Sequence, residues 1–180
     1  MNADNITDIR AQASGVFYVA PKGTTLPADA STALGADFKQ LGYAAKDGLT
    51  ISDNRETVQW DAWESDDVVR VSESHTVELS FRLMEPFQEQ AAKLLFGSGN
   101  VTVASDEVTK IVVNDEDLDE SVLVAEMLLR DGTKMRMVVG RFQPTEVGEM
   151  TLQRGEFFAP EVTGAALGQS NGEKIAYYFA

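Results

Sequence analysis

The chain has 180 residues, no cysteine and a formal net charge of −14 at pH 7. This length suits one domain. Without cysteine the chain forms neither disulfides nor thiolate metal sites, which is compatible with a reducing compartment. Binding to nucleic acid by phosphate neutralisation requires clustered Lys and Arg, so the charge argues against it, and equally against anionic membranes. Residues 1–12 lack the pattern of a secretory signal, and no apolar run approaches the ~20 residues that cross a bilayer. We therefore expect one domain, residues 1–180.

The first fifty residues predict short strands and loops. Residues 15–20 (GVFYVA) form a β-rich run that ends at Pro21, and we expect residues 1–14 before it to be an N-terminal arm. Residues 21–35 are rich in Pro, Gly, Ser and Thr, which is typical of a loop. Residues 42–52 predict two short strands separated by a turn at Asp47-Gly48, because Asp-Gly favours turns.

The clearest pattern in the sequence is a two-residue alternation from Val69 to Leu83. The apolar odd positions are Val69, Val71, Val77, Leu79, Phe81 and Leu83. The polar even positions are Arg70, Ser72, Ser74, Thr76, Glu78, Ser80 and Arg82. Such a period places apolar side chains on one face and polar side chains on the other. Because most strands have only about 3–10 residues, this is an unusually long strand, or two strands with a weak bend near Ser72–Ser74.

One helix is predicted after this strand, in residues 86–97. Pro86 suits the first turn, and Gly97 suits the C-terminal stop. Its apolar side chains recur at helical spacing: Phe87, Ala91, Leu94 and Leu95.

The remaining sequence predicts strands. The candidates are residues 101–113, a hairpin of residues 121–130 and 133–142, residues 149–158 and residues 175–179. Asp131-Gly132 favours a type I′ turn in the hairpin. No repeat of 20–50 residues is present. The pattern therefore predicts a mainly β fold with one short helix.

Several short motifs in this sequence resemble those of a known family. The matching elements are Ala20-Pro21, Gly23-Thr24, Pro27, Leu41-Gly42-Tyr43, Asp47-Gly48 and Ala62-Trp63. Together with the long alternating strand, the short helix and the later strand–turn–strand order, they resemble the major tail proteins of long-tailed phages (siphoviruses), which are tail-tube subunits. The resemblance implies a β-sandwich or barrel-like sheet pair with one flanking helix.

The resemblance also implies a function. Such subunits self-assemble into hexameric rings, and the rings stack into a hollow tube that delivers DNA into the host. It implies a structural virion protein of the phage tail, assembled in the host cytoplasm, with no cofactor and no enzymatic activity. Expected partners are other copies of the chain, the tape-measure protein and passing DNA in the lumen, and the tail tip and tail terminator proteins; no membrane is expected.

The resemblance leads us to expect two functional surfaces, one that faces the lumen and one that contacts other subunits. The polar face of the long strand is a candidate lumen wall: Arg70, Ser72, Ser74, Thr76, Glu78, Ser80 and Arg82. The alternative is an ordinary solvent-facing sheet. Tyr43, Trp60 and Trp63 are candidate inter-subunit anchors, because Tyr and Trp are frequent at interface hot spots; alternatively either Trp caps the local core. We expect residues 44–66 to be an extended inter-ring loop and residues 160–180 a C-terminal strand or arm that orders on assembly.

The sequence gives weaker support for calcium binding, catalysis or carbohydrate binding. Asp115, Asp117, Asp119 and Glu126 have some of the spacing of a calcium loop, but Glu120 stands where that loop needs glycine, so a solvated acidic loop is the alternative. His75 is the only histidine, and we expect it to be packed or at an interface. No hydrolase motif accompanies it. A different class, a soluble β-sandwich binding module for carbohydrate, would use Tyr43, Trp60 and Trp63 as a stacking platform.

Overall fold

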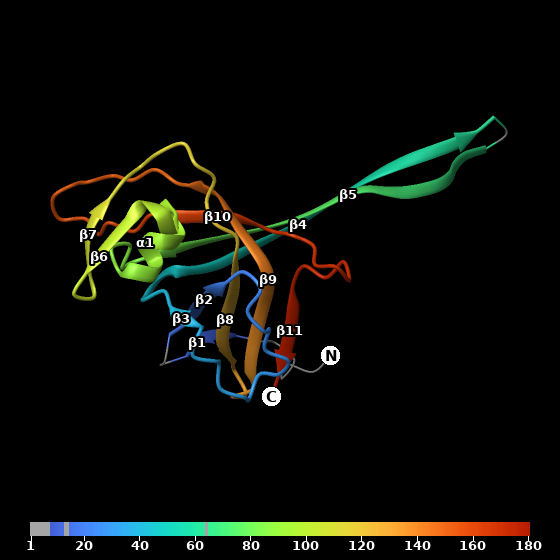
Figure 1. Ribbon diagram of the computed structural model, residues 1–180. Coiled ribbons are helices and arrows are strands. Elements are labelled where there is room, and N and C mark those ends of the chain that lie inside the picture. Colours follow the sequence, from blue (N-terminus) through green and yellow to red (C-terminus); the bar gives the residue numbers. More distant parts are fainter. Residues whose placement is uncertain (1–7, 13–14, 64) are drawn as a thin grey trace.

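The computed structural model describes residues 8–12, 15–63 and 65–180, which form a curved β-sheet body with a long projecting hairpin (Figure 1). Nine strands join one antiparallel sheet, whose main order is β3-β2-β8-β9-β10-β5-β4. They are β1 (Ile9–Ala11), β2 (Phe17–Pro21), β3 (Lys39–Gln40), β4 (Ala44–Ala62), β5 (Ser65–Leu83), β8 (Ser121–Leu129), β9 (Lys134–Val147), β10 (Glu161–Ala166) and β11 (Ala176–Phe179). The mainly β fold class is confirmed.

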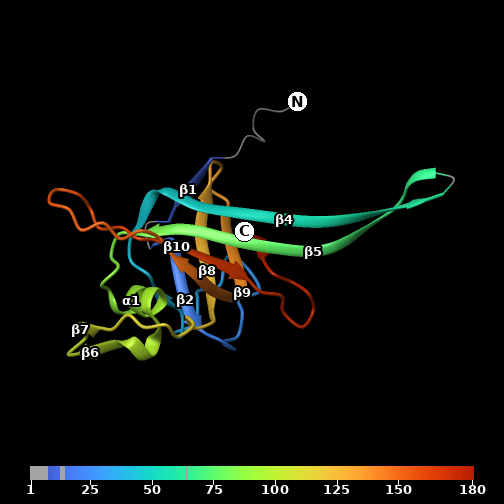
Figure 2. The ribbon, with the colours of Figure 1, turned by 90° about the horizontal axis from the view of Figure 1, so that it is seen from above.

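The sheet closes around its core because two long strands each pair with two shorter ones along one edge. β8 pairs with β1 near Leu129 and with β2 near Ser121, while β9 pairs with β11 and then with β10. As a result β5 and β4 cross above β8 and β9 (Figure 2). Aromatic side chains fill the space between the layers, with ring centroids 4.5 Å apart for Phe17 and Phe81 and 6.1 Å apart for Phe81 and Phe142.

Gly164 in β10 shows how tightly this core is packed. A Cβ atom at this position would lie 2.4 Å from the ring of Phe142, so any side chain would displace that ring. Half of the six residues of β10 are Gly or Ala, which have weak β-propensity. The strand therefore forms because its backbone pairs with both β5 and β9.

The helix α1 (Glu89–Phe96) covers one side of the sheet (Figure 1). Its buried residues are Ala91, Ala92, Leu94 and Leu95. The Gln88 side chain accepts hydrogen bonds from the N–H groups of Gln90 and Ala91, and Gly97 (φ 88°) ends the helix with an N–H bond to Lys93 O, as the sequence predicts. Beside the helix lie the 3₁₀ turn η2 (Ser98–Asn100) and a second, two-stranded sheet of β6 (Val101–Ala104) and β7 (Glu107–Ile111).

Several sequence predictions are wrong in detail. Residues 42–52 are not two short strands: β4 is one strand, and Gly48 (φ 76°) lies where its register shifts against β5. The helix begins at Glu89 rather than in its predicted first turn. Gly132 has a positive φ but Asp131 does not, so the hairpin turn is not type I′, which needs both. Residues 149–158 form a loop, because no neighbouring strand pairs with them.

The predicted arms are right only in part. Residues 160–180 contain two strands, β10 and β11, as the strand alternative predicted, but they belong to the body and bury Val162 and Ala166. In the predicted N-terminal arm, β1 pairs with β8; residues 1–7 and 13–14 lie outside the described residues. Residues 44–66 are not a loop but β4, the turn at the hairpin tip and the first residues of β5; residue 64 lies outside the described residues.

Candidate assembly surfaces

The β4–β5 hairpin changes its apolar face halfway along its length. Near the body, Ile51 lies opposite Leu79 and Asp53 opposite Val77. Between Glu56–Ser74 and Thr57–Ser72 the register skips one residue, so Glu73 is an extra residue in β5. Beyond this bulge Val58 lies opposite Val71, and Trp60 opposite Val69.

The consequence follows from the pleat of the sheet. Paired residues point to the same face, and β4 alternates without a break from Asp53 to Trp60, so Val58 and Trp60 point to the face opposite that of Asp53. Val69 and Val71 therefore point away from the side on which Val77 is buried. Contacts agree with this: Ser74 Oγ donates to Glu56 Oε2 at 2.9 Å, and Arg70 donates to Gln59 Oε1 at 3.4 Å.

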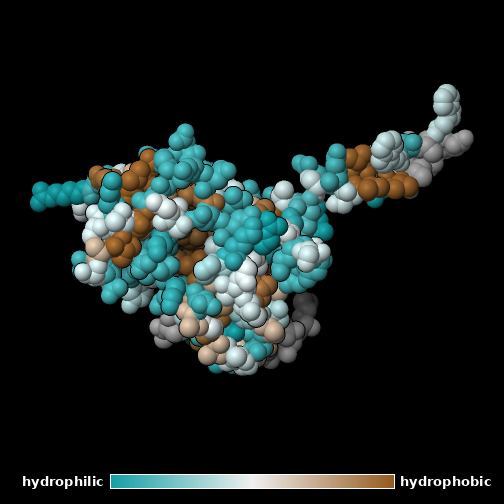
Figure 3. Space-filling model, in the orientation of Figure 1, coloured by the Kyte–Doolittle hydropathy of each residue, from teal (hydrophilic) through white to brown (hydrophobic). Residues whose placement is uncertain are grey.

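The distal half of the hairpin is thus an exposed apolar face, which we call the tip face: Val58, Trp60, Val69 and Val71. Trp60 is 66% exposed and Trp63, in the turn, is completely exposed. Figure 3 shows apolar atoms along this part of the hairpin, far from the body. The expectation that Trp60 or Trp63 caps the local core is wrong, because neither contacts the core cluster.

Tyr43 does not join the two tryptophans. It is 76% exposed and lies just before β4, at the root of the hairpin. At ~3.3 Å per residue, the 17 residues from Tyr43 to Trp60 span roughly 55 Å. The three aromatic residues therefore cannot form one stacking platform in a single copy.

The predicted lumen-facing side chains also lie on two faces rather than one. Thr76, Glu78, Ser80 and Arg82 share the face of Ser74, whereas Ser72 and Arg70 point to the other side beyond the bulge. On the first face Arg82 Nη2 donates to Glu161 Oε2 at 3.0 Å, and Ser80 contacts Thr163 at 3.1 Å. Arg82 is thus neutralised by a neighbouring acid, whereas Glu78 is an exposed carboxylate further along the same face.

His75 lies at the hairpin root, where β5 leaves the body. Its Nε2 is 2.7 Å from Asp53 Oδ1, its backbone carbonyl accepts a hydrogen bond from Lys174, and its side chain is partly exposed. Burial, with the charge of Asp53, raises the pKa of nearby Tyr177. His75 is therefore partly buried and held by Asp53 at the hairpin root.

The acidic loop does not gather its carboxylates around one point. Asp119 Oδ2 accepts hydrogen bonds from the backbone N–H (2.8 Å) and hydroxyl (2.5 Å) of Ser98, and these bonds lower its pKa. Glu126 pairs with Arg136, which is buried. Within the described residues no group of three or more acidic, His or Cys side chains could hold a metal ion. The four residues of the calcium candidate are thus not brought together.

Glu120 is the most strongly held carboxylate in this loop. Its Oε1 accepts from Arg141 Nη2 at 3.0 Å, and its Oε2 lies 2.8 Å from Lys22 Nζ. The hydrogen bonds from Arg141 and then from Lys22 lower the pKa of Glu120 from 4.5 to about 2. These two ion pairs tie the end of the loop to β9 and to Lys22, which directly follows β2.

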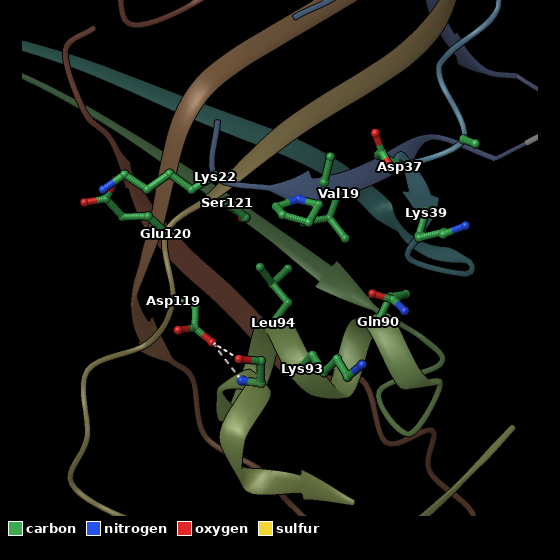
Figure 4. Close-up of a pocket in the computed structure, with 14 residues that line it drawn as sticks. Val19, Lys22, Asp37, Lys39, Gln90, Lys93, Leu94, Asp119, Glu120 and Ser121 are labelled. Atoms are coloured by element: carbon green, nitrogen blue, oxygen red, sulfur yellow. Dashed lines mark hydrogen bonds and ion pairs between the residues drawn. The ribbon is translucent and has the colours of Figure 1, made fainter. Parts of the chain in front are cut away.

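A pocket that the sequence did not reveal lies between α1 and strands β2 and β3 (Figure 4). Its volume is about 550 Å³. Val19, Pro21 and Leu94 are among its apolar lining residues. Its charged lining residues are Lys22, Lys39, Lys93, Asp37, Asp119 and Glu120. Ser121 Oγ, which is buried in its wall, has no hydrogen-bond partner.

An exposed apolar loop lies at the other end of the molecule from the hairpin. Leu152 and Phe157 are mostly exposed in the loop of residues 148–160, and Phe158 stacks on Phe87 with centroids 5.3 Å apart. Phe87 thus precedes the helix instead of lining its core face. This loop and the hairpin point in opposite directions in both ribbon views (Figures 1 and 2). A single copy therefore leaves apolar surface exposed at both ends.

Exposed apolar surface at two opposite ends is typical of a structural subunit that buries surface on assembly. The sequence comparison agrees: residues 2–180 match the model of a family described as phage tail tube protein, and the chain belongs to that family. The chain is thus a tail tube protein, which assigns it to a phage tail and suggests a non-enzymatic role. No curated protein matches the sequence.

Three solved structures resemble the fold at low identity. The cap of the anti-feeding prophage, which terminates its tube, has a TM-score of 0.44 and 10% identity, covering 100% of this chain and 99% of that one. A PVC sheath–tube complex of an extracellular contractile injection system has a TM-score of 0.46 and 7% identity, covering 94% and 92%. The PVC sheath/tube terminator has a TM-score of 0.43 and 10% identity, covering 90% and 92%.

Within the described residues, no helix is both long enough and apolar enough to span a membrane.

Proposed function

We propose that this chain is the tail-tube subunit of a siphovirus. Its copies close into hexameric rings, and the rings stack into a hollow tube that guides DNA into the host. The observation that carries the proposal is the tip face, which places Trp60 and two valines in solvent on a hairpin that leaves the body. In an isolated monomer this exposure is costly, because each apolar Å² in water costs about 25 cal/mol.

The geometry suits a heterologous contact, in which one surface meets a different surface of the next copy. The hairpin supplies one half of such a contact, and the body supplies the other. Repetition of a heterologous contact by rotation closes a ring, and repetition along an axis builds a tube. The hairpin is the element that reaches the adjacent ring, with Trp60 and Trp63 as anchors and Tyr43 contacting a neighbour at the hairpin root.

The charge of the chain suits a conduit for DNA. A wall that carries lysines would bind phosphates with release of counterions, whereas a wall with carboxylates and hydroxyls repels them. The net charge is −14. In this proposal Ser74, Thr76, Glu78 and Ser80 line the lumen, and Arg82 is neutralised there by Glu161.

The same proposal names the partners and the place of assembly. Rings polymerise in the host cytoplasm on the tail tip proteins, around the tape-measure protein, and end at the terminator. DNA and the tape-measure protein pass without specific binding, and the chain turns over no substrate.

Negative-stain electron microscopy of the purified protein tests this function. Rings or tubes of uniform bore are expected. A protein that remains monomeric at every concentration and salt condition, also when mixed with isolated tail tips, would contradict it. The carbohydrate-binding alternative lacks its platform, because Tyr43 lies roughly 55 Å along the hairpin from Trp60.

A further inference from the structure

The tip of the hairpin cannot reach the pocket of its own chain. The pocket lies beside α1, and the hairpin leaves the opposite side of the body in both ribbon views (Figures 1 and 2). β4 and β5 are paired along almost their entire length, so the hairpin is an extended ribbon and does not fold back. The completely exposed Trp63 and the pocket are therefore both open in one copy.

The pocket has the size and lining that an aromatic side chain needs. A volume of about 550 Å³ lies within the range of roughly 300–1,000 Å³ that small-molecule sites occupy. Val19, Pro21 and Leu94 offer apolar walls. Lys22, Lys39 and Lys93 project around it (Figure 4), and a lysine ammonium group over an indole face is favourable.

Charge also favours this pairing. Residues 57–69 contain four acids, Asp61, Glu64, Asp66 and Asp67, and no basic residue. Most of this acidic chain would repel such a segment. The lining of the pocket has no net charge, because its three lysines equal its three acids in number. From outside the pocket, Arg141 pairs with Glu120 and Glu89 pairs with Lys93, so these two further charges also cancel.

We propose that Trp63 of one copy inserts into the α1–β2 pocket of another copy. This inference rests on the proposed function, since it names the surface that receives the hairpin in the assembled tube. The contact is heterologous, so each copy uses its hairpin toward one neighbour and its pocket toward a different one.

Tryptophan fluorescence tests the insertion, because the chain has only two tryptophans and both lie at the hairpin tip. In a Trp60→Phe variant, Trp63 is the only tryptophan. Its emission is expected to shift to the blue when tubes form, and to shift back when they dissociate.

A short-range quencher locates the site. The chain has no native cysteine, so Ala36→Cys at the pocket rim can carry one nitroxide label, and Lys110→Cys on β7 carries the matched control label. Assembly is expected to quench Trp63 strongly with the label at position 36 and to leave it unchanged with the label at 110. If Trp60→Phe does not assemble, the wild-type tryptophans serve as the emitters in the same two labelled proteins.

Charge reversal at the pocket tests whether electrostatics favour the insertion. Lys39→Glu is expected to raise the critical concentration for assembly severalfold, whereas Lys110→Glu leaves it unchanged. Adding Asp61→Lys to Lys39→Glu is expected to restore much of the loss.

The outcomes separate the two proposals. Tubes in which Trp63 is quenched from position 36 support the insertion. Tubes in which Trp63 remains exposed, or is quenched only from position 110, overturn the insertion and leave the tube function intact. Failure of the wild-type protein to assemble under any condition overturns both.

Discussion

The two halves of β5 have the same alternating sequence pattern, but their apolar side chains are buried in one half and exposed in the other. From Val77 to Leu83 the apolar odd positions are buried against the body, whereas Val69 and Val71 are about half exposed on the other face of the hairpin. The extra residue at Glu73 separates them. A period of two thus predicts a strand and its two faces, but one bulge decides which face the apolar side chains use and therefore whether they serve folding or assembly.

The largest expected effect comes from the buried half. Leu79→Ala removes a completely buried side chain from the core and should lower the free energy of unfolding by about 2–5 kcal/mol. The matched change in the exposed half, Val71→Ala, should cost about 1 kcal/mol or less. Urea denaturation of the two unassembled variants measures both values. Equal losses would show that the distal half also packs on the body.

Trp63→Ala should show the reverse effect. The side chain contacts nothing in a single copy, so the free energy of unfolding should change by about 0.5 kcal/mol or less. As an interface hot spot it should weaken assembly by about 2 kcal/mol or more, which is roughly thirtyfold in critical concentration. Sedimentation of tubes against free subunit measures this. A variant that assembles at wild-type concentration would remove Trp63 from the interface.

Insertion of one residue between Glu56 and Thr57 in β4 tests the bulge itself. Glu73 then has a partner, so both strands alternate without a break, and Val69 and Val71 move with Trp60 to the face of Val77. We expect a protein that folds, because the body is unchanged, but does not form tubes, because the tip face now points the wrong way. Circular dichroism reports the fold and electron microscopy reports the tubes. Glu73→Ala, which keeps the residue count, is the control and should assemble.

Sequence patterns predicted the elements whose signals are local. These are the strand ending at Pro21, the long alternating strand, the helix stop at Gly97 and the hairpin around Asp131-Gly132. They did not predict β10, because half of its residues are Gly or Ala, which have weak β-propensity, and the strand is held by its pairing with β5 and β9. Nor did they predict that residues 149–158 stay a loop, since whether an apolar run becomes a strand depends on a free neighbour in the sheet.

The candidate surfaces could also be predicted only in part, because some of their features depend on contacts between distant segments. The exposed tryptophans could be predicted, because aromatic residues in so polar a segment do not build a core. The face they occupy could not, because it depends on one register shift between two strands. The α1–β2 pocket could not be predicted either, because its lining residues come from β2, β3, α1 and the loop before β8.

The smallest expected effect concerns the pocket wall rather than the hairpin. Arg141 and Lys22 lower the pKa of Glu120 from 4.5 to about 2, so the folded protein binds a proton here less readily than the unfolded chain. The stabilisation from this ion pair is therefore fully present above pH 4.5 and is lost as the pH falls from 4.5 towards 2. Glu120→Gln should lose that part of the pH dependence of the denaturation midpoint, whereas Glu149→Gln, in the exposed loop, should keep it. If Glu120→Gln and the wild type give parallel curves over this range, the wall does not depend on the ion pair, and the pocket shape must be held by α1 and β2 alone.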